Sequence, residues 1–277
     1  MCIRDSFYSY YFNAKFSCAR ILTIHDLMPR MKMYFGENWS ESVHWMDTII
    51  AVSEYTKSDI INTYNVSPDI IKVVYPGLFK LDVKDSGEIG DRIRKIVKKP
   101  YIMTVSTLRA YKNMLGLVKA FCLFKELNAN TDINLIIVGK NNKSNDVIKE
   151  IMNFCGERRD IIFTGYVTDD ELVYLYKNSI ATGFVSFYEG FGLPVLESLS
   201  YGKTVICSDQ TSIPEVGGDA VEYCNPYDIE SIENAIEKVV LNDNYRQELE
   251  KRALIQAAKF SYSKAAEETL KIYNLFK

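Results

Sequence analysis

The sequence predicts a doubly wound α/β protein, in which parallel sheets are covered by helices on both faces. Short β-rich runs alternate with helix-length amphipathic stretches along the 277 residues, and this alternation is typical of strand–helix–strand units. Several of the short runs are almost continuously apolar, such as the segment LIIV at residues 135–138. Runs of this kind indicate parallel strands that are buried on both sides.

The strands and helices are expected in alternation from residue 21 onward. The expected strands span residues 21–24, 48–52, 71–75, 101–105, 134–138, 161–164, 182–185 and 204–207. The expected helices span residues 54–64, 113–127, 146–154, 169–178, 194–201, 229–241, 245–259 and 263–276.

A change in composition divides the chain near residue 100. Residues 77–99 lose strand character and gain charge, and Pro100 then precedes a new strand. We therefore expect a partial N-terminal Rossmann-like domain plus linker at residues 1–99, with three strands. A C-terminal Rossmann-like domain is expected at residues 100–277, with five strands. Three strands are few for a partner domain of similar size, so we expect the first half of the N-terminal domain to be missing and residues 1–6 to be an added leader.

The composition argues against several classes of protein. The chain is 47% hydrophobic and 25% charged with a formal net charge of −3, which fits a folded globular protein and, without a long basic block, disfavours nucleic-acid binding. Six scattered cysteines without a C-x-x-C pair, and only two histidines, indicate reduced thiols and disfavour a metal site. No segment is long and apolar enough to cross a bilayer.

The most informative segment is SFYEGFGLPVLE at residues 186–197. A strand is expected to end near its start, and Pro194 stands where a first helical turn should begin. Gly190 and Gly192 allow the backbone to come close to a ligand, and the N–H groups at a helix N-terminus form a ready anion site. The segment therefore predicts a phosphate-binding loop before a helix.

Two carboxylates frame this loop. Glu197 lies about one turn into the expected helix, where it can accept two hydrogen bonds from a ribose diol. Glu189 precedes the first glycine. Taken singly, Glu189 is equally compatible with a solvated loop residue, and Glu197 with a residue that only complements the helix dipole.

Lys112 and His25 are further candidates. Lys112 stands just before the helix expected at residues 113–127, where a cation opposes the dipole preference unless an anion is bound there. His25 follows an expected strand and should lie at its carboxyl end. The alternatives are an exposed surface lysine and a turn histidine. Ser53 is explained as a helix N-cap and is left outside the site.

Glu189 and Glu197 form an E-x7-E pattern. With this pattern the chain resembles retaining glycosyltransferases of the GT-B fold, in particular sequence family 4. The resemblance covers about residues 20–277, and several further segments match in order. They are residues 23–26 (TIHD), 49–56 (IIAVSEYT), 73–77 (VVYPG), 101–121, 213–219 (IPEVGGD) and 260–262 (FSY).

The resemblance implies the following fold and activity. Two Rossmann-like domains, the C-terminal one complete and the N-terminal one partial, would transfer a hexose of the mannose or glucose type with retention of configuration. The donor would be a UDP- or GDP-sugar, with no other cofactor and no metal, and the acceptor a glycan or lipid-linked molecule in cell-surface polysaccharide synthesis. The enzyme would be cytoplasmic, at most peripheral to the inner face of the membrane, and would not bind nucleic acid. Without the first half of its N-terminal domain, the chain is expected to bind donor and to be nearly inactive in transfer.

The resemblance also assigns roles to residues. Lys112 would contact the donor diphosphate, Glu189 the hydroxyls of the donor sugar, and His25 the sugar near its anomeric carbon. Glu197 would hold the ribose. The other expected donor-binding residues are Arg109, Gly190, Phe191, Gly192, Leu193, Gly165, Tyr166 and Val167.

The match is loose at one phosphate contact. The family usually places an arginine beside the lysine, where this chain has Tyr111, and Arg109 is the nearest arginine. Gly165 is equally compatible with a simple turn residue.

Two other kinds of function stay open. One is another GT-B enzyme, such as a sugar-nucleotide epimerase or a phosphorylase. The E-x7-E pattern argues against the epimerase, and the lack of a lysine in a cofactor-bearing context argues more weakly against the phosphorylase. The other is a nucleotide-sugar-binding module without turnover.

Overall fold

The computed structural model describes residues 2–3, 19–27, 43–78, 89–107, 109–139 and 146–276. Contacts divide the chain into two compact units. The first unit comprises Met1–Phe79, Glu189–Gly192 and Phe260–Lys277, and the second comprises Lys80–Tyr188 and Leu193–Lys259. The C-terminal segment and the loop at residues 189–192 therefore group with the N-terminal residues, whereas our sequence analysis had assigned both to the C-terminal domain.

Among the residues that the structure describes, the first unit contains a parallel sheet of four strands in the order β1-β2-β3-β4. The strands are β1 (Cys2–Ile3), β2 (Arg20–Ile24), β3 (Thr48–Ala51) and β4 (Ile71–Val73). The helices are α3 (Glu54–Tyr64), the 3₁₀ turn η1 (Pro68–Ile70) and α12 (Tyr262–Asn274). The expected count of three strands is corrected to four, because β1 lies within the residues that we had interpreted as a leader.

Alternation along the strands explains how this sheet is covered. Successive side chains of a strand point to opposite faces. Leu22 and Ile24 belong to a core cluster with Ile60 of α3, whereas Ile21 and Ile50 belong to a second cluster with Ile272 of α12. The helix at the end of the chain thus covers one face of the sheet built at its beginning.

In the described part of the second unit, a parallel sheet has six strands in the order β10-β9-β8-β5-β6-β7. The strands are β5 (Tyr101–Val105), β6 (Asn134–Val138), β7 (Ile161–Gly165), β8 (Ala181–Phe184), β9 (Val205–Ser208) and β10 (Glu222–Cys224). The five expected strands are confirmed with small shifts at their ends, but the expected count of five is wrong. The additional strand, β10, lies at the edge of the sheet, and only Cys224 of its three residues is buried, so it lacks the apolar run of a central strand.

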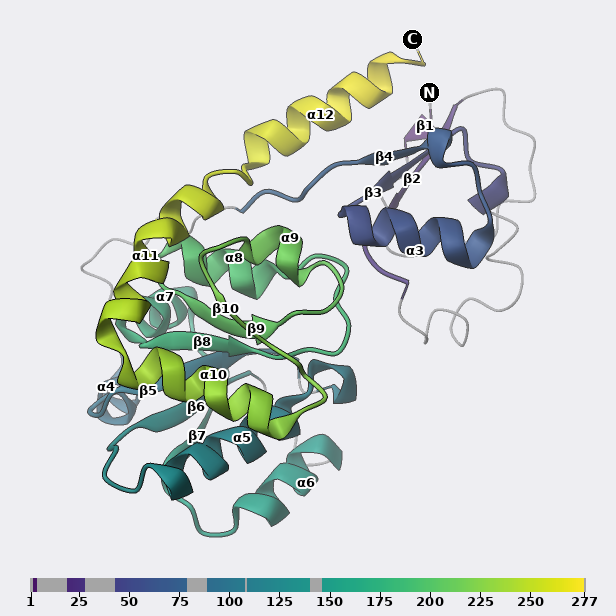
Figure 1. The fold of residues 1–277 in the computed structure, drawn as a ribbon. Coiled ribbons are helices and arrows are strands. Elements are labelled where there is room, and N and C mark those ends of the chain that lie inside the picture. The colour runs from purple at the N-terminus through teal and green to yellow at the C-terminus, as the bar shows by residue number, and fades with distance from the viewer. Residues whose placement is uncertain are drawn as a thin grey trace. The chain divides into compact units, whose positions relative to one another are not determined.

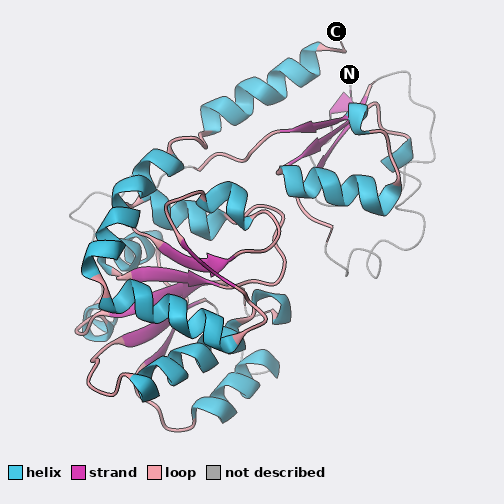
Figure 2. Cartoon of the chain, viewed as in Figure 1, coloured by secondary structure: helices cyan, strands magenta, loops and turns pink. Residues whose placement is uncertain are grey.

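Helices cover both faces of this larger sheet (Figures 1 and 2). They are α4 (Asp91–Ile96), η2 (Ala110–Lys112), α5 (Met114–Leu127), α6 (Asp146–Cys155), α7 (Asp169–Asn178), α8 (Leu193–Ser200), α9 (Ile213–Gly217), α10 (Ile229–Leu241) and α11 (Asp243–Ala257). On one face α5, α6 and α10 share a core cluster that contains Phe121, Ile148 and Ile236. On the other face α4 and α7 contribute Ile93 and Leu175 to a second cluster.

Helix α4 lies inside the segment that we had interpreted as linker. Its apolar residues Ile93 and Ile96 are three positions apart, on one side of a helix. Ile93 is fully buried in the second cluster and Ile96 packs against it. The charged residues between them had concealed this periodicity.

Strand order creates a switch point between β5 and β8. From β5 the chain moves outward through β6 and β7, and then it returns to the other side of β5 and continues through β8, β9 and β10. In open parallel sheets, ligands bind outside the carboxyl ends of the strands at such a point. The loops after β5 and β8 are therefore the natural place for a site in the second unit.

Candidate functional site

Lys112 lies in the loop that follows β5, at the switch point of the second sheet. It ends the turn η2, and α5 begins two residues later at Met114. Its ammonium nitrogen lies 5.0 Å from the ring centre of Tyr111 and 5.5 Å from that of Phe184, at the end of β8. Both rings are within the range at which aromatic faces attract a cation, so the charge of the loop that follows β5 lies near the end of β8.

The two residues beside Lys112 both bond to the exit of β8. The backbone N–H of Phe187 donates to the carbonyl of Tyr111 at 2.9 Å. The side-chain amide of Asn113 donates to the carbonyl of Val185 at 3.1 Å and to that of Pro226 at 2.7 Å. These bonds fix the backbone of Lys112 on both sides relative to β8.

Asn113 adopts a left-handed backbone conformation, with φ 52°. Asparagine is one of the few residues other than glycine that tolerate this conformation. Its side chain fills the space above Gly116, where an added Cβ would lie 2.3 Å from Oδ1 of Asn113. The sequence K-N-x-x-G thus combines a buried asparagine side chain, that of Asn113, with a glycine, Gly116, that leaves room for it.

Glu197 lies near the middle of α8, and the hydroxyl of Tyr176 in α7 donates a hydrogen bond to its Oε2 at 2.7 Å. Tyr176 is almost fully buried and stacks on Tyr201 with ring centres 5.7 Å apart. Burial raises the pKa of the Glu197 carboxyl above its ordinary value, and the bond from Tyr176 opposes that rise in pKa. We did not anticipate Tyr176, because nothing in the sequence of α7 sets it apart from other buried aromatic residues.

The loop after β7 carries Gly165, Tyr166 and Val167. Gly165 has a φ of +68°, which favours glycine and agrees with the turn interpretation. The guanidinium of Arg92 donates to the carbonyls of Thr164 and Tyr166, and the Tyr166 side chain is exposed. Arg92 belongs to α4, so the helix missed in the sequence analysis supplies a residue that supports this loop.

The other expected residues of the second unit also follow the carboxyl ends of its strands. Arg109 is exposed and immediately precedes η2, in the loop that carries Lys112. Leu193 is partly exposed at the first position of α8. Because all strands of this sheet are parallel, the loops after β5, β7 and β8 lie at the same end of the sheet, beyond the carboxyl ends of its strands.

In the first unit, the loop Glu189–Gly192 is held by the N-terminal end of α3. The carbonyl of Gly190 accepts a hydrogen bond from Ser53 Oγ at 2.7 Å and one from Thr56 Oγ1 at 3.0 Å. Ser53 is also the N-cap of α3, as expected. Ser53 Oγ also donates to the carbonyl of Gly190, and a helix N-cap does not require that second bond.

Gly190 approaches the backbone at the end of β2. A Cβ added to it would lie 1.7 Å from the carbonyl oxygen of His25, so no side chain fits there. The next residue, Phe191, packs against Tyr75 and Phe260, with ring centres 6.2 and 5.6 Å away. His25 and the loop Glu189–Gly192 therefore lie close together within the first unit.

His25 also lines a cavity of about 350 Å³ in the first unit. Thr23, Ile50 and Val74 of the sheet and Ala265 of α12 contribute to its wall. The cavity lies on the face of the sheet that α12 covers, because Ile50 and Val74 also belong to the cluster that contains Ile272 of α12.

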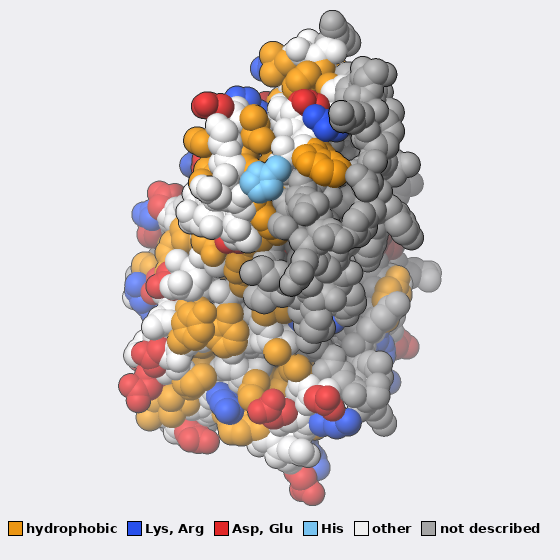
Figure 3. All heavy atoms as spheres, turned by 90° about the vertical axis from the view of Figure 1, so that its right-hand side faces the viewer, with side chains coloured by type: hydrophobic (Ala, Val, Ile, Leu, Met, Phe, Trp, Pro, Cys, Tyr) orange, Lys and Arg blue, Asp and Glu red, His pale blue; other side chains and the backbone are white. Residues whose placement is uncertain are grey.

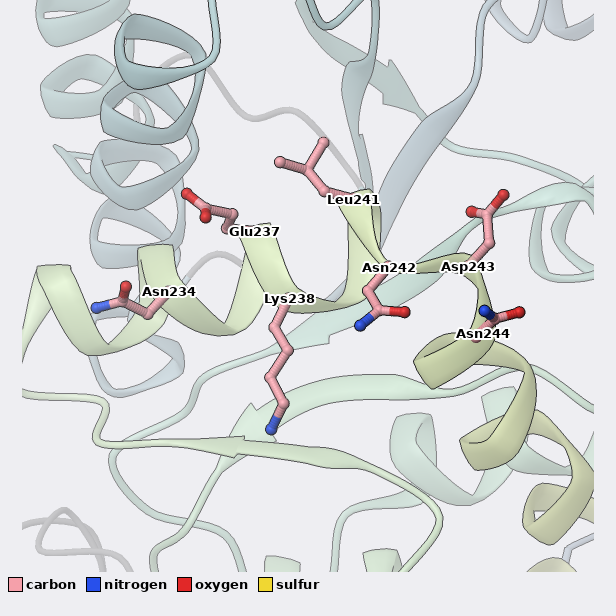
Figure 4. A pocket seen from close by; sticks show the side chains of 7 residues that line it. All are labelled: Asn234, Glu237, Lys238, Leu241, Asn242, Asp243 and Asn244. Carbon is pink, nitrogen blue, oxygen red and sulfur yellow. The ribbon is translucent and has the colours of Figure 1, made fainter.

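A larger cavity of about 680 Å³ lies where α10 meets α11 (Figure 4). Its lysine, Lys238, is bonded to both oxygens of Glu222 at 3.0 Å and lies 4.3 Å from the ring centre of Tyr245. Helix α10 follows β10 and runs back toward the amino ends of the parallel strands. Its C-terminal end and this cavity therefore lie at the opposite end of the sheet from the switch point. It contains none of the expected site residues.

Charged side chains are mixed with other types on the face of the molecule that Figure 3 shows. Acidic and basic side chains both occur there, interspersed with hydrophobic and neutral ones. Within the described parts of the chain, no three histidine, cysteine or acidic residues are grouped as metal ligands. Among the helices that the structure describes, none is both long and apolar enough to cross a membrane.

Comparison with known families decides the identity of the chain. The protein family described as "Glycosyl transferases group 1" matches residues 86–256, and the family described as "Glycosyltransferase Family 4" matches residues 5–78. The chain belongs to the group 1 glycosyltransferases. These matches confirm the resemblance to glycosyltransferases that the sequence motifs indicated.

Relatives of this group 1 glycosyltransferase include two proteins of Escherichia coli. O-antigen chain mannosyltransferase B is 30% identical over 259 residues, covering 92% of this chain and 68% of that protein. Serotype-specific mannosyltransferase WbdA is 28% identical, covering 89% of this chain and 32% of that protein. The chain thus spans about two thirds of the first relative and about one third of the second.

The solved structure of Anabaena Alr3699/HepE in complex with UDP and glucose shares the fold. It superimposes with a TM-score of 0.75 at 17% identity, covering 92% of this chain and 71% of that chain. The group 1 glycosyltransferase described here therefore has the GT-B fold, as the family resemblance implied.

Proposed function

We propose that this chain binds a nucleoside-diphosphate sugar and belongs to an enzyme that transfers the hexose, of the mannose type, to a glycan or lipid-linked acceptor during surface polysaccharide synthesis. The observation that carries the proposal is the position of Lys112. Its neighbours on both sides are bonded to the exit of β8, at the switch point where parallel sheets bind ligands. The mannose type is supported by the relatives, which are named as O-antigen and serotype-specific mannosyltransferases.

In this proposal, the second unit stabilises the leaving group. Lys112 and the N-terminal N–H groups of α8 provide positive charge and hydrogen-bond donors for the diphosphate. Arg109, in the same loop, would add a second cation. Glu197 would accept hydrogen bonds from the ribose, and the residues after β7, Gly165 to Val167, would contact the base.

In the first unit, Glu189 would hold hydroxyls of the donor hexose and His25 would hold the sugar near its anomeric carbon. Transfer with retention then breaks the bond between the anomeric carbon and the diphosphate. The acceptor hydroxyl attacks from the face that the diphosphate leaves, and its proton passes to a phosphate oxygen. The contribution of the protein is positioning and charge stabilisation.

Incubation with radiolabelled GDP-mannose or UDP-glucose and a panel of glycan and lipid-linked acceptors tests this proposal. Labelled product with one donor, lost in Glu189→Gln, would support it. Saturable donor binding without transfer or hydrolysis is the result expected of a nearly inactive chain, and equally of a binding module without turnover. Absence of binding to every sugar nucleotide, from folded protein, would contradict both.

A further inference from the structure

A short motif in the first unit, S-E-Y-T at residues 53–56, has a hydrogen-bonding role that helix capping does not explain. The N-cap bond needs only Ser53, whose Oγ accepts from the N–H of Thr56 at 2.9 Å. Both hydroxyls nevertheless converge on one acceptor, the carbonyl of Gly190. That carbonyl lies 137 and 134 positions away in sequence.

The anchor is buried and compact. Ser53 and Thr56 are both completely inaccessible to solvent, and their hydroxyl oxygens are 2.9 Å apart. Buried hydrogen bonds are costly to break, because the group left behind has no water to replace its partner. The carbonyl of Gly190 is therefore held more firmly than a loop carbonyl exposed to solvent.

The same glycine is confined from a second direction. The carbonyl of His25 approaches it so closely that no side chain can be accommodated. Only the φ and ψ torsions of Gly190 lie between its own carbonyl and the planar peptide bond to Glu189, and the close approach of the His25 carbonyl leaves Gly190 little room to change them. Fixing the carbonyl of Gly190 thus restricts where the backbone of Glu189 can lie.

We propose that Ser53 and Thr56 are positioning residues for Glu189, acting through the carbonyl of Gly190. The inference deepens the proposed function, on which it rests, because it concerns the carboxylate that would hold the donor hexose. Ser53 and Thr56 touch neither the donor nor the acceptor in this scheme. Their effect is on the orientation of Glu189 alone.

The test uses Thr56→Val, which keeps the branched shape and removes the hydroxyl that bonds Gly190. Thr56 is preferred to Ser53 because its hydroxyl has no capping role. The matched control is Thr63→Val on the same helix, where the hydroxyl is exposed and lies 3.5 Å from Asp59. Thr56→Ser restores a hydroxyl and is the rescue variant.

Two affinities are measured for each variant, one for the sugar nucleotide and one for the sugar-free nucleoside diphosphate. We expect Thr56→Val to weaken binding of the sugar nucleotide by about 3- to 10-fold, the effect of one hydrogen bond. Binding of the sugar-free nucleotide should be unchanged. Thr56→Ser should recover the preference for the sugar nucleotide, and Thr63→Val should behave as the parent. Equal loss of both affinities, or no loss of either, would overturn the inference.

Hydrogen exchange keeps this inference separable from the proposed function. If the chain binds no sugar nucleotide, the proposed function fails, but the anchor can still be tested. Thr56→Val should then accelerate amide exchange in residues 189–192, while exchange in the core of α5 stays as in the parent. Unchanged exchange in the loop would show that the hydroxyls do not position it.

Discussion

The hydroxyl of Tyr176 lies 2.7 Å from Oε2 of Glu197 and donates a hydrogen bond to it. The two residues come from successive helices of the second unit, α7 and α8. The bond holds one carboxylate oxygen in a defined place. It also favours the ionised form of Glu197, against the burial that raises its pKa. This relationship makes the carboxylate sensitive to pH and to the loss of one hydroxyl.

The first prediction concerns this pH dependence. The pKa of Glu197 is raised from its ordinary 4.5, so the carboxylate takes up a proton at a higher pH than most glutamates do. A ribose that needs the ionised carboxylate should bind less well as the pH falls toward that raised pKa. Tyr176→Phe removes the bond that lowers the pKa, and the loss of affinity should then begin at a higher pH.

Calorimetry with GDP or UDP over about pH 5 to 8, around the range in which phosphate also titrates, measures this effect. Glu197→Gln provides the baseline, because it retains the phosphate titration and removes that of the carboxyl. A parent and a Glu197→Gln variant with identical pH profiles would rule out a role for the Glu197 carboxylate in nucleotide binding.

The two glutamates of the E-x7-E pattern should differ in their effects. Glu197→Ala should weaken binding of the sugar-free nucleoside diphosphate by about 1–3 kcal/mol, as expected for lost hydrogen bonds to a charged group. Glu189→Ala should leave that binding almost unchanged and lower the affinity for the sugar nucleotide. Titrations of both variants with both ligands check this division, and equal effects on the sugar-free nucleotide would contradict it.

Asn113→Asp should destabilise the second unit. The substitution places carboxylate oxygens beside the carbonyls of Val185 and Pro226, to which the amide now donates. Each buried acceptor left unpaired should cost about 1–3 kcal/mol in the free energy of unfolding. Denaturant unfolding gives this value. The matched control is Asn65→Asp, which shares the left-handed conformation at an exposed position, and a similar loss in both variants would refute the role of the buried amide.

Gly190→Ala should disturb the loop of the first unit. Its new Cβ would collide with the carbonyl of His25, and overpacking of this kind costs about 1–3 kcal/mol. Gly156→Ala is the comparison, since Gly156 has a positive φ of 56° but no atom within 4 Å of an added Cβ. Only Gly190→Ala should reduce the preference for sugar nucleotide over free nucleotide. Competition binding measures this, and an unchanged preference in Gly190→Ala would contradict the assignment.

Most strands and helices could be predicted because parallel strands and amphipathic helices have strong local patterns. The fully buried β6 reads as NLIIV, and the two termini of α3 match the expected residues 54–64. The short edge strand β10 and the charged helix α4 escaped prediction, because neither presents a long apolar run. Periodicity also shows which side of α12 is apolar, but not which sheet that side covers.

The candidate site, like the fold, could be predicted only in part from the sequence. Lys112, Glu197 and the glycine loop could be identified from short motifs. Their supporting contacts could not, because these join residues distant in sequence, such as Ser53 with Gly190 and Tyr176 with Glu197. A hydroxyl that caps a helix and one that also anchors a distant loop look alike in the sequence. Only the fold distinguishes them.

The central claim is that the switch point of the second unit binds a nucleoside diphosphate through Lys112. Titration calorimetry of the 277-residue chain with GDP and with UDP tests it most directly, beside Lys112→Ala and the control Lys149→Ala, an exposed lysine paired with Asp146. We expect saturable binding of one nucleotide by the parent and by Lys149→Ala, and a loss of roughly 10-fold or more in Lys112→Ala, as for a charge-assisted bond. Binding of equal strength in all three proteins, or no binding by the folded parent, would contradict the claim.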